Sequence, residues 1–196
     1  MAATATVAAR KYTVQDYIDL PEDGNRYELI DGELTMAPSP DYFHQKSSHQ
    51  LDRLIGNYLD ANPIGEIFTA PFDVYLGTLN AVQPDLVYIS NENRSVLRSR
   101  IHGTPDLVIE ILSPSNAQLD LGRKRQIYQE HRVREIWYIY PQARKIAVER
   151  LDDTGSGYGP KQEYTEDSIL TTPLMPGLEL SLANIFKLPG VSPASD

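Results

Sequence analysis

The chain has 196 residues, of which 41% are hydrophobic and 23% charged, and this composition indicates a globular domain rather than a disordered chain. It contains no cysteine, which excludes disulfides and thiolate metal sites and makes a reducing cytoplasm the expected location. The formal net charge of −9 argues against broad electrostatic binding to nucleic acid, and no apolar run approaches the ~18 residues that cross a bilayer.

The N-terminal part predicts a tail, a short helix, a hairpin and a longer helix. We expect residues 1–11 to form a flexible tail, residues 12–186 one domain, and residues 187–196 a C-terminal tail. Thr13 followed by Asp16 has the spacing of a helix N-cap, which predicts a helix over 14–20. In RYELIDGELTMAP, the dipeptide Asp31-Gly32 favours a type I′ turn and hence a β-hairpin. Apolar residues at helical spacing predict a helix over 41–61.

The rest of the chain predicts strands separated by one helix. EIFTAPFDVYL (66–76) and VQPDLVYIS (82–90) are each expected to form a strand, the second beginning near Pro84 or lying at a sheet edge there. A polar loop (91–104) precedes the apolar strand DLVIEIL (106–112), and 116–131 is expected to be a helix capped by Ser113 or Ser115. EIWYIY (135–140) and KIAVERL (145–151) predict a hairpin, and LTTPLMPGLELSLANIF a strand with a short closing helix. This order predicts an α/β fold in which helices flank a mixed sheet.

Two carboxylates interrupt the apolar strands. Strand alternation puts Glu110 on the same face as Val108, and Asp85 on the same face as Val87. Burying a carboxylate is costly unless it is paired, protonated or bound to a cation. If the two strands are neighbours, Asp85 and Glu110 converge, and a hard ion such as Mg²⁺ or Mn²⁺ suits their oxygen atoms. The alternative is a buried ion pair between Glu110 and an arginine or lysine.

Basic residues near the predicted carboxylates are candidates for contacts with water or phosphate. On its predicted helix Lys124 shares a face with Tyr128, which would turn it toward the interior, where it could position an attacking water or stabilise phosphate charge. Asp120 lies four residues before Lys124, so a surface ion pair is the alternative. Two basic segments, 94–102 and 123–134, could hold a nucleic-acid backbone or could be ordinary solvated faces.

The order of these motifs carries a family resemblance. YELIDGELTMAPSP, PFDVYL, VQPDLVYIS, PDLVIEILSPSN and a helix with Lys124 before REIWYIY resemble the Uma-type putative restriction endonucleases, a former domain of unknown function in the PD-(D/E)XK nuclease superfamily. The resemblance covers roughly residues 12–186 and implies a restriction-endonuclease-like core with an N-terminal β-hairpin. Asp85 would supply the "D" of the PD pair and Glu110 the next acid. Leu112 occupies the usual lysine position, so the resemblance implies Lys124 as its substitute.

The resemblance implies a Mg²⁺- or Mn²⁺-dependent endonuclease that hydrolyses phosphodiester bonds in DNA. Asp85, Glu110 and the backbone carbonyl of Ile111 would hold the metal, and Lys124 would position or deprotonate the water. Glu33 in the hairpin is a candidate further acid, although it also fits an exposed strand residue.

Three further expectations remain open. His44, at the start of the helix over 41–61, could contribute to the site in place of Glu33. A homodimer is expected, because two-fold nucleases commonly cut duplex DNA as dimers, and the apolar segment 173–186 could pack in the core or against a second copy. The alternative function is a nuclease fold that serves as a binding or assembly module without turnover.

Overall fold

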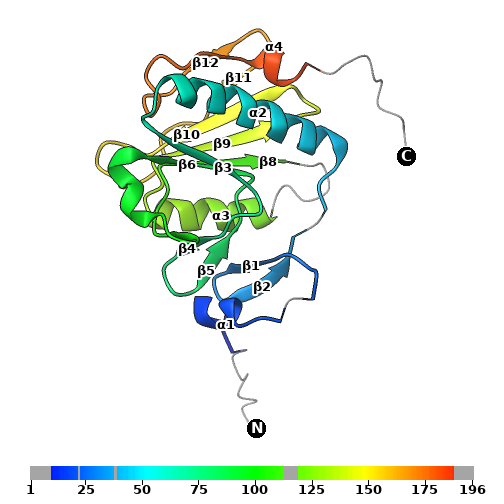
Figure 1. Ribbon diagram of the computed structural model, residues 1–196, viewed down its shortest axis with the longest axis vertical. Helices are drawn as coiled ribbons and strands as arrows, with labels where there is room; N and C mark the ends of the chain where they lie inside the picture. Colours follow the sequence, from blue (N-terminus) through cyan, green and yellow to red (C-terminus); the bar gives the residue numbers. More distant parts are fainter. Residues whose placement is uncertain (1–9, 22, 38, 113–118, 188–196) are drawn as a thin grey trace, which may run out of the picture.

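The computed structural model describes residues 10–21, 23–37, 39–112 and 119–187, and its strands form two large sheets and one small one (Figure 1). The six-stranded sheet has the order β11-β10-β9-β8-β6-β3 and comprises β3 (Gly65–Thr69), β6 (Leu86–Ser90), β8 (Leu107–Ile111), β9 (Glu135–Tyr140), β10 (Lys145–Arg150) and β11 (Gln162–Tyr164). The five-stranded sheet has the order β2-β1-β5-β4-β7 and comprises β1 (Tyr27–Ile30), β2 (Glu33–Met36), β4 (Val74–Leu76), β5 (Asn80–Val82) and β7 (Ile101–His102). The third sheet pairs β12 (Ile169–Leu170) with β13 (Leu180–Ser181).

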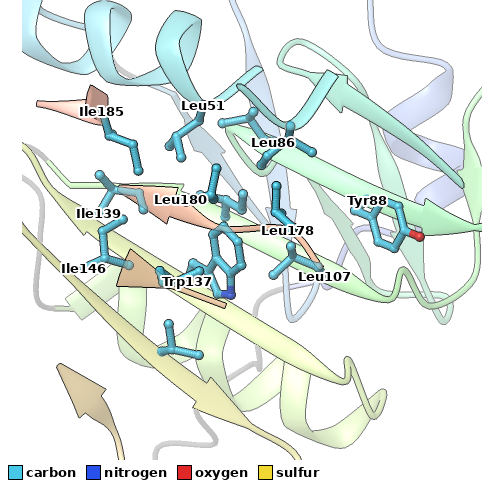
Figure 2. Close-up of a cluster of buried hydrophobic side chains, with 14 of the residues drawn as sticks. Leu51, Leu86, Tyr88, Leu107, Trp137, Ile139, Ile146, Leu178, Leu180 and Ile185 are labelled. Carbon is cyan, nitrogen blue, oxygen red and sulfur yellow. The ribbon is translucent and has the colours of Figure 1, made fainter. Parts of the chain in front are cut away.

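Helices cover both faces of the six-stranded sheet (Figure 1). The helices are α1 (Val14–Ile18), α2 (Tyr42–Ala61), α3 (Leu119–Glu130) and α4 (Leu182–Ile185). On one face, α2 and α4 pack over a core that includes Leu51, Leu86, Trp137 and Ile185 (Figure 2). On the other face, α3 and the five-stranded sheet enclose a second core. The pairing is mixed, because β8 and β9 run parallel whereas β6 and β8 run antiparallel. The predicted α/β fold is therefore confirmed.

Local sequence signals account for the N-terminal elements. Thr13 and Asp16 form a complete capping box at the start of α1. Asp31 and Gly32 both have positive φ, 51° and 77°, as a type I′ turn requires, and they join β1 to β2. Asp41 caps α2 by accepting a hydrogen bond from the His44 backbone N–H at 2.8 Å. No helix within the described residues is long and apolar enough to span a membrane.

At two prolines the chain passes from one large sheet to the other, and the single strand predicted over 66–76 is therefore wrong. The segment 66–76 is broken at Pro71, so that β3 belongs to one sheet and β4 to the other. The strand expected to begin near Pro84 does so, since β6 begins at Leu86, and Val82 before the proline is the last residue of β5. Proline has no N–H for a ladder and a fixed φ, so the chain changes sheet at these points. The loop predicted over 91–104 contains a 3₁₀ turn (Asn91–Val96) and β7. The predicted caps Ser113 and Ser115 lie outside the described residues.

The apolar C-terminal segment packs inside its own chain. Met175, Leu178 and Leu180 are buried in the same core as α2, as are Leu182 and Ile185 of α4. Of the two placements expected for 173–186, the structure shows the core. The homodimer therefore has no support from this segment and stays a prediction.

Candidate active site

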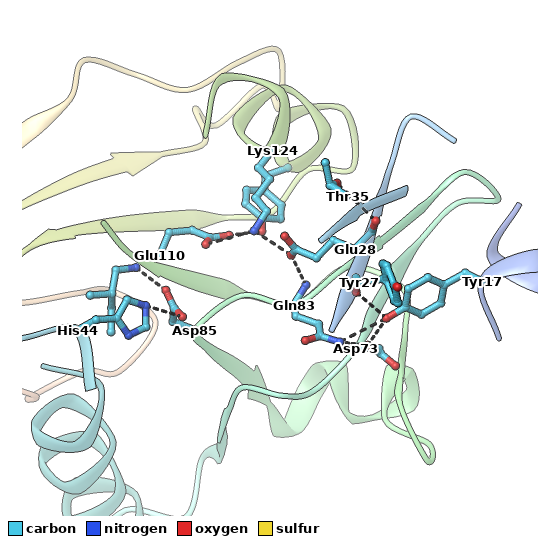
Figure 3. Close-up of polar contacts among 12 residues, drawn as sticks. Tyr17, Tyr27, Glu28, Thr35, His44, Asp73, Gln83, Asp85, Glu110 and Lys124 are labelled. Carbon is cyan, nitrogen blue, oxygen red and sulfur yellow. Dashed lines mark hydrogen bonds and ion pairs between the residues drawn. The ribbon is translucent and has the colours of Figure 1, made fainter. Parts of the chain in front are cut away.

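The two predicted carboxylates lie where the chain passes from the five-stranded to the six-stranded sheet. β5 ends at Val82 and β6 begins at Leu86, so Asp85 occupies the crossing. Leu86 pairs with Ile109, and continuing this antiparallel register by one residue places Asp85 opposite Glu110. Directly opposed residues have Cβ atoms about 5 Å apart on the same face of a sheet. Figure 3 shows the Glu110 side chain directed toward Lys124 of α3 and the Asp85 carboxylate directed toward His44 of α2.

Asp85 is held by two protein donors. Its Oδ2 accepts a hydrogen bond from the Ile111 backbone N–H at 2.6 Å, and its Oδ1 lies 3.0 Å from His44 Nε2. The carboxylate side chain retains 18% exposure. Burial alone would lower the pKa of His44, but the nearby carboxylates, Asp85 first among them, outweigh it and raise that pKa. His44, which the sequence offered only as an alternative to Glu33, is thus brought into direct contact with Asp85.

Glu110 is almost completely enclosed. The Tyr128 hydroxyl donates to Glu110 Oε1 at 2.5 Å, and Lys124 Nζ lies 3.6 Å from Oε2. Burial raises the pKa of Glu110 to about 7, with the charges of Asp85 and Glu28 adding to the rise and Lys124 opposing it. Glu110 can therefore gain or lose a proton near neutral pH, and a nearby cation would favour its ionised form.

Lys124 is buried between two carboxylates. It is only 8% exposed, and its Nζ lies 2.8 Å from Glu28 Oε1, closer than it lies to Glu110. Lys124 is therefore not at the surface, whereas the side chain of Asp120, its partner in the alternative ion pair, lies outside the described residues. The alternative ion pair between Glu110 and a lysine is present in the geometry, so both interpretations of Glu110 remain to be separated by experiment.

Glu28 is a further buried acid of the cluster that the sequence patterns above did not single out. This residue is 5% exposed in β1, and its Oε1 also accepts a hydrogen bond from the Gln83 backbone N–H at 2.7 Å. Its signal was available, because Glu28 is an acid next to the apolar residues Leu29 and Ile30, the same anomaly that singled out Glu110.

The structure does not bring Glu33 to the cluster. Glu33 lies on the outer strand β2 opposite Ile30, with its side chain 67% exposed. It forms an ion pair with Arg123 at 2.9 Å instead. The hairpin acid that lies in the cluster is therefore Glu28 and not Glu33. Glu28 is on β1, which packs against α3, whereas Glu33 is on β2, the edge strand of its sheet.

The two basic segments are largely compensated within the protein. Their arginines form ion pairs with acids from other elements: Arg94 with Glu66, Arg100 with Asp73, Arg123 with Glu33, Arg125 with Glu149 and Arg134 with Asp106. These ion pairs leave less positive charge for a DNA backbone than the sequence suggested. For these five arginines the structure therefore favours an ordinary surface role over binding of nucleic acid.

The oxygen atoms of Asp85, Glu110 and Ile111 are suitable ligands for a hard divalent cation, but they are too few to fill its coordination sphere without water or substrate. Among the described residues, no group of three or more histidine, cysteine or acidic side chains is placed to hold a metal ion. Asp85 and Glu110 nevertheless match the usual Mg²⁺ pattern of one or two carboxylates completed by waters and substrate phosphate. The N–H and C=O of one strand residue point to the same edge, so the Ile111 carbonyl projects to the side where its N–H meets Asp85.

Comparisons with known proteins show the family of the chain and match its fold. A family model described as "Uma2: Putative restriction endonuclease" matches residues 14–183. The chain belongs to the Uma2 family. Its fold is similar to the crystal structure of a protein described as a putative nuclease of DUF820 from Anabaena variabilis, with a TM-score of 0.75 and 20% identity over 89% of this chain and 97% of that one. No match was found among curated proteins. The Uma2 match spans every residue of the Asp85–Glu110–Lys124 cluster and Glu28.

Proposed function

We propose that this Uma2-family chain is a divalent-metal-dependent endonuclease that hydrolyses phosphodiester bonds in DNA. The observation that carries the proposal is the placement of Asp85 opposite Glu110, with Lys124 Nζ 3.6 Å from the Glu110 carboxylate. Two carboxylates so close repel each other unless one is protonated or both share a cation. A lysine beside such a pair can stabilise the negative charge that develops on a phosphate during hydrolysis.

Each residue of the cluster has a distinct role in this proposal. Asp85, Glu110 and the Ile111 carbonyl would hold Mg²⁺ or Mn²⁺, which when bound polarises a phosphate oxygen and lowers the pKa of a bound water. Lys124 would position that water and offset the charge that develops on the phosphate. Glu28 would orient the Lys124 ammonium through their 2.8 Å contact, which holds it close to Glu110.

His44 would act on the opposite side of the cluster. Its Nε2 contacts Asp85 Oδ1 at 3.0 Å, while the Ile111 N–H holds Oδ2, so the Asp85 carboxylate is fixed at both oxygens. A carboxylate fixed in this way is pre-oriented and needs little rearrangement on binding a cation. His44 is therefore a positioning residue in this scheme.

The test is nicking of supercoiled plasmid in Mg²⁺, in Mn²⁺ and in EDTA. Nicking should require the divalent ion and should fall by ~100-fold or more in Asp85→Asn and in Glu110→Gln, since each change removes one ligand charge. Glu66→Gln is the matched control, because Glu66 is an exposed acid whose partner is Arg94. Unchanged nicking by both cluster variants would eliminate the proposed site.

A second candidate, a binding or assembly module without turnover, is favoured by one specific observation. Every carboxylate oxygen of Asp85 and Glu110 already contacts a protein group, namely His44, the Ile111 N–H, Tyr128 or Lys124. Calorimetric titration with Mg²⁺ separates the candidates. Heat that disappears in Asp85→Asn would support the metal site, whereas its absence in the unaltered protein would favour the module.

A further inference from the structure

A cavity separate from the carboxylate cluster lies among α1, β1 and the segment 99–102. Its volume is about 620 Å³, within the ~300–1,000 Å³ typical of small-ligand pockets. Aromatic and basic side chains gather in its lining: Tyr17, Tyr27, Tyr75, Arg26, Arg100 and His102. Neither the candidate active site nor the roles given to its residues account for this cavity.

Gln83 connects the cavity to the carboxylate cluster. Its side chain lines the cavity and donates from Nε2 to Asp73 Oδ1 at 2.8 Å, whereas its backbone N–H is bound to Glu28 in the cluster. Figure 3 shows this path, which runs from Tyr17 and Asp73 through Gln83 and Glu28 to Lys124. Gln83 precedes Asp85 by two residues, which span at most ~7 Å. The cavity is therefore close enough to Asp85 for one DNA strand to reach both.

The tyrosines of the cavity are fixed with their hydroxyls engaged. The Tyr17 hydroxyl lies 3.0 Å from both the Tyr27 carbonyl and Asp73 Oδ1, and the Tyr27 hydroxyl donates to Asp23 at 2.7 Å. The Tyr75 ring packs edge-to-face with Tyr17 and with His102, at 6.4 and 5.0 Å between ring centroids, and its hydroxyl donates to Asp73 Oδ2 at 3.4 Å. Because the hydroxyls have protein partners, the rings are held in place, and what they can offer a ligand is ring surface. Aromatic ring surface stacks on nucleic-acid bases.

The cavity also has a local positive charge in an acidic protein. Arg100 donates from Nε to Asp73 Oδ2 at 3.0 Å, which fixes its guanidinium, yet its side chain remains 50% exposed. Arg26 and His102 line the same cavity. Asp73 is 9% exposed and already receives hydrogen bonds from Arg100, Tyr17 and Gln83, so its own charge is satisfied. Guanidinium groups at the rim are suited to bind phosphate.

We propose that this cavity binds one unpaired nucleotide of the DNA strand that enters the active site. Its base would stack on the Tyr75 ring, and its phosphates would lie against Arg26 and Arg100. An intact duplex presents only base edges in its grooves, so a concave aromatic site requires a base that has left the stack. This inference takes its substrate class from the proposed endonuclease function, and it narrows that class to DNA with an unpaired nucleotide near the cut.

The test measures binding of a short fluorescent single-stranded DNA in EDTA, so that no cleavage is required. Tyr75→Leu should weaken binding about 5- to 150-fold, the range of one lost base–aromatic stack, whereas Tyr75→Phe keeps the ring and should bind nearly as well as the unaltered protein. A blunt duplex of the same sequence should bind more weakly than the single strand.

The arginines give a second and independent readout. Arg26→Gln and Arg100→Gln should each reduce the slope of log K against log salt by about 0.7, because each removes a phosphate contact on a single strand. Arg98→Gln is the matched control, since Arg98 is an exposed arginine of the same segment that does not line the cavity.

Two results would overturn the inference: equal affinities for Tyr75→Leu and Tyr75→Phe, or duplex binding as tight as single-strand binding. Plasmid nicking reports separately on the endonuclease. Single-strand binding that depends on Tyr75, without any nicking, would support nucleotide binding in the cavity and contradict the endonuclease. Nicking without an effect of Tyr75→Leu on binding would support the endonuclease and contradict nucleotide binding in the cavity.

Discussion

Changing Glu110 to glutamine removes one buried charge while preserving the size and shape of the side chain. The two interpretations of Glu110 predict opposite effects on the stability of the metal-free protein. A structural partner of Lys124 should be needed for folding. A metal ligand held close to Asp85 and Glu28 should instead destabilise the metal-free fold in its ionised form.

The magnitude follows from the pKa of Glu110. This pKa is raised from 4.5 to about 7, so the folded protein binds an extra proton between these values and its stability falls as pH rises through that window. The difference corresponds to about 3 kcal/mol at most. We therefore expect Glu110→Gln to be nearly neutral near pH 4.5 and to increase the free energy of unfolding by up to about 3 kcal/mol near pH 8. Tyr128 can still donate to the amide oxygen that replaces Glu110 Oε1.

Urea unfolding followed by fluorescence measures this effect, because the protein has one tryptophan, Trp137, and it is fully buried. The control is Glu149→Gln, which removes a buried carboxylate that Arg125 holds at 2.7 Å and should lower the stability near pH 8. Added Mg²⁺ should stabilise the unaltered protein and not Glu110→Gln. A loss of several kcal/mol by Glu110→Gln near pH 8 would refute the metal-ligand interpretation.

Three further outcomes are expected. Lys124→Met should cost about 3–5 kcal/mol near neutral pH, measured by urea unfolding, because it leaves the buried Glu28 without its cation; a neutral effect would contradict the buried ion pair. Glu28→Gln should reduce plasmid nicking, and Glu33→Gln should not, since only Glu28 contacts Lys124; the reverse order would restore the hairpin prediction. His44→Gln should lower stability more near pH 6 than near pH 9. Because the pKa of His44 is raised in the folded protein, protonated His44 contributes fully to the free energy of unfolding below pH 6.5. This contribution is lost as the pH rises through the pKa of His44 in the folded protein. A pH-independent effect would show that the Asp85 contact does not depend on a protonated imidazole.

Strand alternation was sufficient to place Glu110, because the period of two fixes the face on which a strand side chain lies. It assigned Glu110 to the face that α3 covers, and helical spacing turned Lys124 inward, whereas Asp85 lies just before β6 and contacts His44 of α2. Local patterns could not show that Pro71 and Pro84 divide two apparent strands between separate sheets, since a proline is equally compatible with an edge strand. Which acid of the hairpin is buried depends on how the five-stranded sheet packs against α3. Because these segments are far apart in the sequence, local patterns could not favour Glu28 over Glu33.

The charge balance of the cluster separates it from the other buried acids of the described residues. Glu149 and Glu135 each have an arginine partner, Arg125 and Arg150. In the cluster, by contrast, the carboxylates of Glu28, Asp85 and Glu110 meet one lysine and one histidine. A core that needed only stability would do as well with apolar residues of similar volume, because burying charge costs more than pairing usually returns. In the proposed endonuclease, Asp85 and Glu110 would use this excess of negative charge to bind the cation, while Glu28 holds Lys124 beside them.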